Sequence, residues 1–79
     1  MNELSLTQLE EGKAATVAAL HGGCSFERRL RSVGIKEGKP VRMVARHPFA
    51  GPVVVEVDGR RITIGRGMAQ RIAVALQKQ

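Results

Sequence analysis

The alternation of apolar and polar positions is clearest in the second half of the chain, after Gly38. Every second position there is apolar over two stretches, and residues such as Arg42 and Glu56 fall between them: Val41, Met43 and Ala45, then Val53, Val55 and Val57. A period of two is typical of a strand that buries one face. The pattern therefore predicts strands over residues 41–46 and 53–57.

Asp58-Gly59 lies directly after the second of these stretches and is a strong signal for a two-residue hairpin turn. Such a turn aligns the stretch before it with residues 60–64 after it. The register pairs Val57 with Arg60, Val55 with Ile62 and Val53 with Ile64, and sets Glu56 opposite Arg61. One register thus matches apolar residues on one face and opposite charges on the other, which predicts a further strand over residues 60–64.

Residues 25–33 have a helical rather than an extended pattern. At about 100° per residue, Phe26, Leu30 and Val33 share one narrow face, whereas Arg28 and Arg31 point away from it. Ser25 is a favourable N-cap, and Glu27 precedes Arg31 by four residues. Gly34 suits a left-handed residue at the C-terminus, after which Ile35 can fold back on Leu30.

The remaining segments are short. Residues 7–10 (TQLE) read as a capping box that begins one helical turn, which Gly12 ends. Residues 13–20 and 72–74 are predicted strands, and a break at residues 65–67 precedes a turn at 68–70.

Five short strands, with one helix after the first, favour a small closed or nearly closed β-barrel, because an open sheet of this size would expose two edges.

The composition narrows the class of protein. A chain of 79 residues predicts one domain, and its single cysteine, Cys24, cannot form an internal disulfide. No apolar run approaches the roughly 20 residues of a membrane span, and the first residues do not resemble a secretory signal. We therefore expect a soluble cytoplasmic protein. Its net charge of +6 favours an anionic partner, which could be nucleic acid, a lipid surface or an acidic protein.

No catalytic constellation is visible. The seven acidic residues do not pair at helix or strand spacing beside a histidine, and neither a nucleophile elbow nor a phosphate-binding glycine loop occurs. The sequence therefore predicts a protein without catalytic residues or a cofactor, and not an enzyme.

His21-x-x-Cys24 is the one fragment with metal-ligand chemistry. Stable zinc or iron sites need three or four ligands, and this fragment supplies two. We favour the alternative, in which His21 is an exposed turn residue and Cys24 a half-buried position before the helix. No metal ligand is assigned on this basis.

Direct nucleic-acid binding is the alternative that the charge supports, through arginines on nearly every predicted element. Small barrels that bind single strands also use aromatic platforms. Phe26 is expected in the core, which leaves Phe49, in the loop of residues 47–52, as the one candidate. That residue could equally contact a partner protein or fold back as a lid over the barrel end.

The order of these elements resembles the FeoA family of small ferrous iron transport proteins. The resemblance rests on R-L-x-x-x-G-I-x-x-G at residues 29–38 and P-x-x-G-P at residues 48–52, and it covers roughly residues 4–75. The apolar and glycine positions that extend it are Leu6, Leu9, Gly12, Ala15, Val17, Leu20, Val41, Val44, Val55, Val57, Gly59, Ile62, Ile64, Ala69, Ile72 and Val74.

The resemblance implies a mostly β, SH3-like barrel spanning residues 1–79 as one domain. It also implies a non-enzymatic, cytoplasmic accessory protein that binds and modulates FeoB, a membrane Fe(II) transporter with a GTP-binding domain. Recruitment to the inner face of the membrane would then come from this partner, and the chain is expected to be a monomer. The candidate partner-binding residues are Arg28, Arg31 and Phe49.

Overall fold

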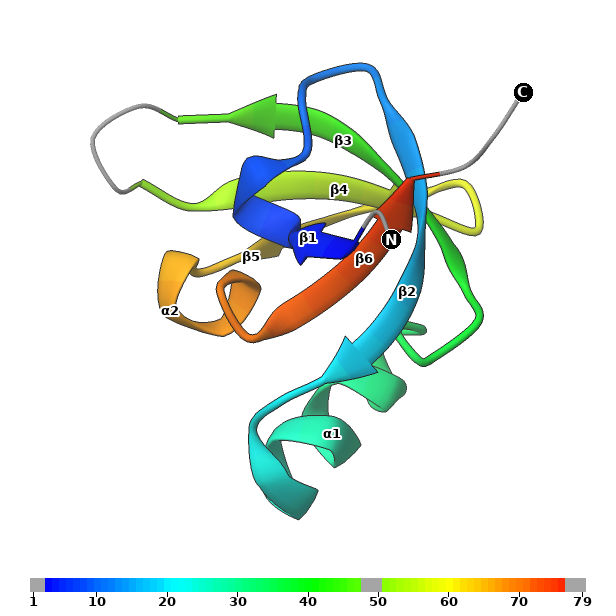
Figure 1. The fold of residues 1–79 in the computed structure, drawn as a ribbon, viewed down its shortest axis with the longest axis vertical. Helices are drawn as coiled ribbons and strands as arrows, with labels where there is room; N and C mark the ends of the chain where they lie inside the picture. Colours follow the sequence, from blue (N-terminus) through cyan, green and yellow to red (C-terminus); the bar gives the residue numbers. More distant parts are fainter. Residues whose placement is uncertain (1–2, 48–50, 77–79) are drawn as a thin grey trace.

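A computed structural model describes residues 3–47 and 51–76 of the chain (Figure 1). In these ranges the chain forms six strands, one longer helix and two short helical turns. In chain order they are β1 (Glu3–Ser5), the 3-10 turn η1 (Leu6–Gln8), β2 (Ala14–Leu20), α1 (Gly23–Ser32), β3 (Pro40–Arg46), β4 (Val53–Val57), β5 (Arg60–Ile64), α2 (Arg66–Ala69) and β6 (Ile72–Leu76).

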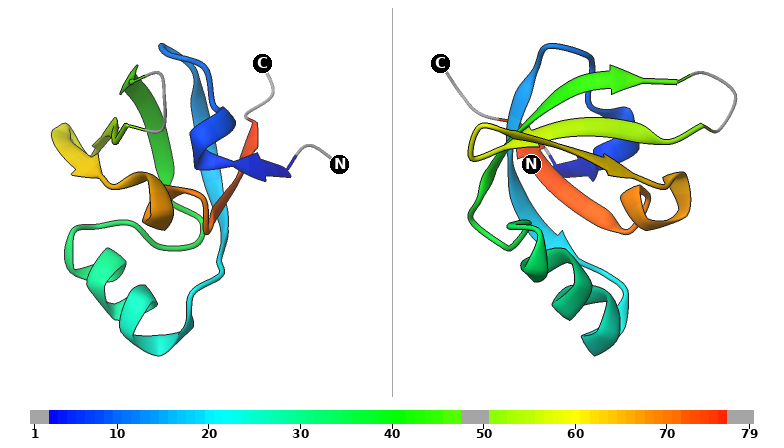
Figure 2. Two further views of the ribbon diagram at one scale, coloured as in Figure 1. Left: turned by 90° about the vertical axis from the view of Figure 1, so that its left-hand side faces the viewer. Right: turned by 180° about the vertical axis from the view of Figure 1, so that it is seen from behind.

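The strands form one antiparallel sheet in the order β1-β6-β2-β3-β4-β5. The sheet curls so that β4 and β5 face β2 and β6 across the core, while α1 projects from one end (Figure 2). The predicted mostly β architecture with one helix is confirmed. The sheet is open between β1 and β5, however, and it has six strands rather than five, so α1 follows the second strand. β1 is only three residues long, too short for a periodic pattern in the sequence to reveal it.

The β4–β5 hairpin has the predicted register at every position, from Val57 opposite Arg60 to Val53 opposite Ile64. The turn residues Asp58 and Gly59 have φ angles of 54° and 78°. Two consecutive left-handed residues match the twist of the flanking strands, which explains why this dipeptide sets the pairing.

In β3, buried and exposed residues alternate as predicted only as far as Met43. Met43 pairs with Val55, but Ala45 pairs with Val54, so the register shifts at Val44. A bulge of this kind bends the strand. Val44 and Ala45 are consequently both half-buried, instead of alternating between the core and the solvent.

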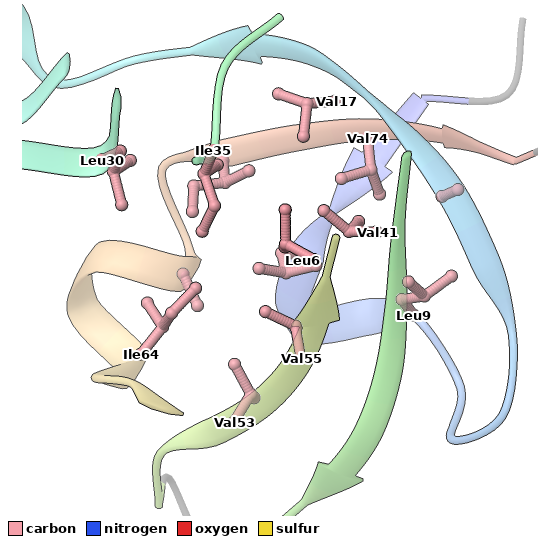
Figure 3. Close-up of a cluster of buried hydrophobic side chains, with 14 of the residues drawn as sticks. Leu6, Leu9, Val17, Leu30, Ile35, Val41, Val53, Val55, Ile64 and Val74 are labelled. Atoms are coloured by element: carbon pink, nitrogen blue, oxygen red, sulfur yellow. The ribbon is translucent and has the colours of Figure 1, made fainter. Parts of the chain in front are cut away.

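The core is an apolar cluster to which every strand from β2 to β6, both turns and α1 contribute (Figure 3). Leu6 and Leu9, at the two ends of the η1 turn, are each 1 % exposed. From α1, Phe26 and Leu30 are buried and Val33 packs at the margin, so the predicted apolar face is confirmed.

The first turn begins earlier than the sequence predicted. Ser5, not Thr7, is its N-cap: the Ser5 hydroxyl accepts from the Thr7 amide at 3.2 Å, and the Gln8 side chain accepts from the Ser5 amide at 3.0 Å. The capping box therefore joins Ser5 and Gln8 rather than Thr7 and Glu10. The Thr7 hydroxyl is occupied by a hydrogen bond with Ser5 Oγ at 2.8 Å.

The start of α1 also differs from the prediction that Ser25 caps it. The helix begins at Gly23, and its N-cap Gly22 makes no side-chain capping bond. The Phe26 ring packs directly on Gly22, where a Cβ would lie 2.3 Å from ring carbon Cγ. Since only glycine leaves room for this ring, the chain turns into the helix at the glycine pair, and Ser25 lies inside the first turn.

The C-terminus of α1 is as predicted. Gly34 has a φ of 94°, its amide donates to the Arg31 carbonyl at 3.0 Å, and the Ile35 amide donates to the Leu30 carbonyl at 2.9 Å. This is the Schellman pattern. It turns the chain back so that Ile35 enters the core, where it is 1 % exposed.

Replacing Leu30 with alanine tests how strongly α1 is held. We expect Leu30→Ala to lower the free energy of unfolding by about 2–5 kcal/mol, because it leaves a cavity beside a side chain that is 2 % exposed. Urea unfolding followed by circular dichroism measures this, with Arg28→Ala on the solvent side of the helix as the control. Equal stability of the two variants would contradict the packing described.

The second stability test concerns Gly34. We expect Gly34→Ala to lower the free energy of unfolding by about 1–2 kcal/mol, because alanine resists a positive φ. The added Cβ itself would meet only Val57 Cγ1, at 3.6 Å, so crowding contributes little. Gly67→Ala in α2 is the matched control, since that glycine has no positive φ and open space around it. Thermal unfolding should separate the two variants, and a Gly34→Ala protein as stable as the control would refute this account.

Candidate functional site

The charged side chains of the described residues lie at the surface of the protein. Within residues 3–47 and 51–76, no polar or charged residue is buried. The features with chemical character are therefore surface features, of which two stand out. One is the outward face of α1, and the other is a groove at the opposite end of the sheet.

The outward face of α1 carries the two arginines predicted to contact a partner. Arg28 and Arg31 are both exposed, whereas Phe26 and Leu30 on the same helix are buried. Arg31 Nη2 lies 3.6 Å from Glu27 Oε1, which confirms the predicted i,i+4 ion pair. Both side chains of that pair remain substantially exposed, so it restrains Arg31 without hiding its charge. Phe49, the third predicted residue, lies outside the described residues.

His21 and Cys24 flank the start of α1. Both are exposed, so the prediction of a half-buried Cys24 was wrong. The helix begins at Gly23, one residue before it, and Cys24 is turned to solvent in the first turn while Phe26 takes the inward position. The described part of the chain contains no group of three or more His, Cys, Asp or Glu side chains placed to hold a metal ion.

The groove was not predicted from the sequence. It has a volume of about 560 Å³ and is lined by Leu4, Gln8, Leu9, Glu10, Gly12, Lys13, Ala14, Arg42 and Leu76. These residues come from β1, η1 and the loop after it, and from the ends of β2 and β6, with Arg42 on β3. In Figure 1 these chain segments lie at the end of β2 away from α1. Leu76, 43 % exposed, is the one large apolar side chain of the described residues that is exposed.

Hydrogen bonds hold the wall of the groove in place. The Gly12 amide donates to the Met43 carbonyl at 2.8 Å, and the Met43 amide donates to the Lys13 carbonyl at 2.9 Å. Arg46 adds two bonds, from its amide to Glu11 Oε2 at 2.8 Å and from Nη1 to the Thr7 carbonyl at 2.9 Å. The loop before β2 is thereby fixed to β3, and the groove is formed in advance of any ligand.

One signal in the sequence could have indicated the groove. Ile72 and Val74 are buried at 0 % exposure, and Leu76 continues their alternation by one more step. The predicted last strand stopped at residue 74, so this apolar side chain was left out. The other lining residues are brought together only by the sheet order, which local patterns do not reveal.

No helix in the described ranges combines the length and apolar character needed to cross a bilayer.

Fold and surface together define a small antiparallel β domain with one packed helix, in which no charged residue of the described ranges is buried. A family model for the FeoA domain matches residues 4–76, and the chain belongs to the FeoA family. A protein of Methanocaldococcus jannaschii named as an Fe(2+) transport protein A is 35 % identical over 65 residues, which cover 82 % of this chain and 77 % of that protein. The family places the chain in ferrous iron transport.

Solved structures agree with this assignment. The crystal structure of an iron uptake regulatory protein (FeoA) superposes with a TM-score of 0.88 at 29 % identity and covers 95 % of this chain and 99 % of that one. The FeoA protein of Chlorobium tepidum gives 0.85 at 25 % identity and covers 95 % and 71 %. A manganese-dependent transcriptional repressor gives 0.86 at 29 % identity, and there the match covers 95 % of this chain but 42 % of the repressor. The predicted SH3-like fold is consistent with these neighbours.

A metal titration tests the expectation that His21 and Cys24 are not ligands. We expect anaerobic Fe(II) titration to give the same isotherm for the wild type and for a His21→Ala/Cys24→Ala variant, because two exposed ligands make only part of a site. Ser25→Ala, at a neighbouring exposed position, is the control. A stoichiometric site that disappears only in the double variant would overturn the expectation.

Proposed function

We propose that this protein is a non-enzymatic, cytoplasmic accessory protein of ferrous iron uptake that binds and modulates a FeoB-type membrane transporter with a GTP-binding domain. Membership of the FeoA family supports the role in ferrous iron uptake. The observation that carries the mode of action is the wholly apolar set of buried residues in the described ranges. With its polar groups at the surface, the protein acts by contact with a partner.

The proposed contact is the outward face of α1. Arg28 and Arg31 project from a helix that stands off one end of the sheet, where a second protein can approach (Figure 2). Arginine is enriched at protein interfaces because its planar group forms several directed hydrogen bonds and stacks on apolar groups. With a net charge of +6, the favoured counterpart is an acidic surface on the cytoplasmic part of the transporter. Phe49 remains a sequence-based candidate for the same contact.

Binding can modulate the transporter only if the two proteins fit one state of the transporter better than another. The difference in affinity between those states limits how far the equilibrium can shift. A small rigid domain suits this role, since it contributes a fixed surface rather than a conformational change of its own. The protein would act as a monomer that recognises one state, and this partner would recruit it to the inner face of the membrane.

Binding to the purified cytoplasmic region of the transporter tests this proposal. We expect measurable affinity by calorimetry and a loss of at least about tenfold for Arg28→Glu and for Arg31→Glu, since charge reversal at an interface arginine turns attraction into repulsion. Arg29→Glu is the matched control, because it makes the same charge change on the same helix but at about 100° from Arg28.

Two results would count against the proposal. The first is an absence of binding by the wild type. The second is sub-micromolar binding to a short oligonucleotide with a steep dependence on salt, which would favour the alternative of direct phosphate binding. Equal losses for all three arginine variants would point to general electrostatic attraction instead of a defined face of α1.

A further inference from the structure

β5 is an edge strand of the open sheet. It is paired along one side with β4, and among the described helices and strands only β4 runs alongside it. The other edge strand, β1, has three residues and β5 has five, so β5 presents the longer free edge. In the view from behind, β5 lies on the side that faces the viewer (Figure 2). A free edge carries a row of main-chain donors and acceptors, to which another extended chain can be added.

The register of the β4–β5 hairpin determines which main-chain groups of β5 are free. After a two-residue turn the flanking residues, here Val57 and Arg60, form a hydrogen-bonded pair, and such pairs recur at every second position. The amide and carbonyl groups of Arg61 and Thr63 therefore point away from β4. In the described part of the chain no other hydrogen bond engages these four groups, and both residues are exposed. The backbone of a further strand can replace the water around them.

The outward side chains predict the charge of such a strand. Arg42, Glu56 and Arg61 are opposite one another on β3, β4 and β5, so their row alternates positive, negative and positive. A strand added beside β5 supplies the fourth position of this row, next to Arg61. Opposite charges at neighbouring cross-strand positions stabilise a sheet, and like charges destabilise it. An Asp or Glu in the added strand therefore continues the alternation.

The inward side chains add an apolar requirement. Val55 and Ile64 are buried at 0 % and 4 % exposure, whereas Ile62, which is opposite Val55, is only half-buried at the margin of the core. An apolar side chain beside Ile62 would remove its remaining surface from water. Because successive residues of a strand face opposite sides, the acidic and the apolar residue are neighbours in the added segment.

The same charges exclude a second copy of β5 as the occupant. A second copy would bring its own Arg60 and Arg61 to this edge, and like charges oppose that pairing. Charged side chains on an edge strand commonly protect a protein against such self-association. Here the protection is selective, because positive charge repels a basic strand and attracts an acidic one. A nucleic acid supplies negative charge but no peptide backbone that matches the free groups of β5.

We propose that the free edge of β5 binds an extended acidic segment of the partner protein as an additional strand. The main chain of the segment bonds to the amides and carbonyls of Arg61 and Thr63. One carboxylate side chain lies beside Arg61, and an adjacent apolar residue covers Ile62. The inference deepens the proposed function and rests on it, because the segment belongs to the transporter.

Hydrogen exchange tests the proposed pairing. The experiment uses the isotopically labelled protein, the cytoplasmic region of the transporter, and overlapping peptides from that region of about ten residues, twice the five of β5. We expect one peptide with an acidic residue beside an apolar residue to bind. At saturation it should slow exchange of the Arg61 and Thr63 amides by at least about tenfold, because these amides gain an acceptor. The amide of Ile62, which is already bonded to β4, should change little.

Variants of the peptide and of the protein separate the main-chain contact from the charge. N-methylation of the peptide at alternate positions should abolish binding for one set of positions and spare the other, since only every second amide of an added strand faces β5. Arg61→Gln should weaken binding by about tenfold and flatten its salt dependence. Arg42→Gln is the matched control, because Arg42 and Arg61 are both exposed and opposite Glu56, and only Arg61 is on the edge strand. The amide spectrum of each variant verifies that the fold is kept.

The outcomes separate the inference from the proposed function. If the transporter region binds, but no peptide slows exchange at Arg61 and Thr63 and Arg61→Gln binds the region as well as the wild type does, the β5 inference is wrong and the proposed function stands. If the wild type binds neither the region nor any peptide, both are wrong. A peptide that slows exchange equally along all of β5, or that tolerates N-methylation at every position, would show binding without strand addition and would also contradict the inference.

Discussion

The packing of α1 on the curled sheet is the contact on which the rest of the structure depends. A ten-residue helix is not stable alone in water, so α1 exists because Phe26 and Leu30 are buried. The ring of Phe26 on Gly22 sets where the helix begins, and Gly34 sets where it ends and returns Ile35 to the core. The same packing decides which side chains remain outside, and so it orients Arg28 and Arg31 toward solvent.

Features that depend on neighbours in sequence could be predicted, and features that depend on distant segments could not. The β4–β5 hairpin follows from a two-residue turn and the alternation around it, and the Schellman end of α1 follows from a glycine at the right spacing. β1 was missed because three residues form a strand here only by pairing with β6, which is about seventy residues away along the chain. The groove was missed for the same reason, since its lining comes from five separate elements.

The charges on the sheet show how little of the net charge is neutralised internally. Glu56 lies between Arg42 and Arg61 in the register of β3, β4 and β5, so one carboxylate stands opposite two guanidinium groups. In the described ranges, ion pairs join only Glu27 to Arg31 and Lys39 to Asp58. The field of the protein is therefore positive on more than one side, which speeds encounter with an acidic partner without selecting where it docks. Selection must come from shape and from apolar contact.

Fold alone leaves the role of this protein open, because a transcriptional repressor contains a closely similar domain in less than half of its length. The same packed sheet thus serves in proteins with different tasks, and the task resides in the surface. On this chain, α1 offers charge with little apolar area, whereas the groove is lined by Leu76, the one large apolar side chain of the described residues that is exposed. Charge on a protruding helix favours fast and salt-sensitive encounter, while a preformed groove with an apolar floor favours a longer-lived and more selective complex. A partner that uses both surfaces would combine rapid capture with specificity, which neither surface achieves alone.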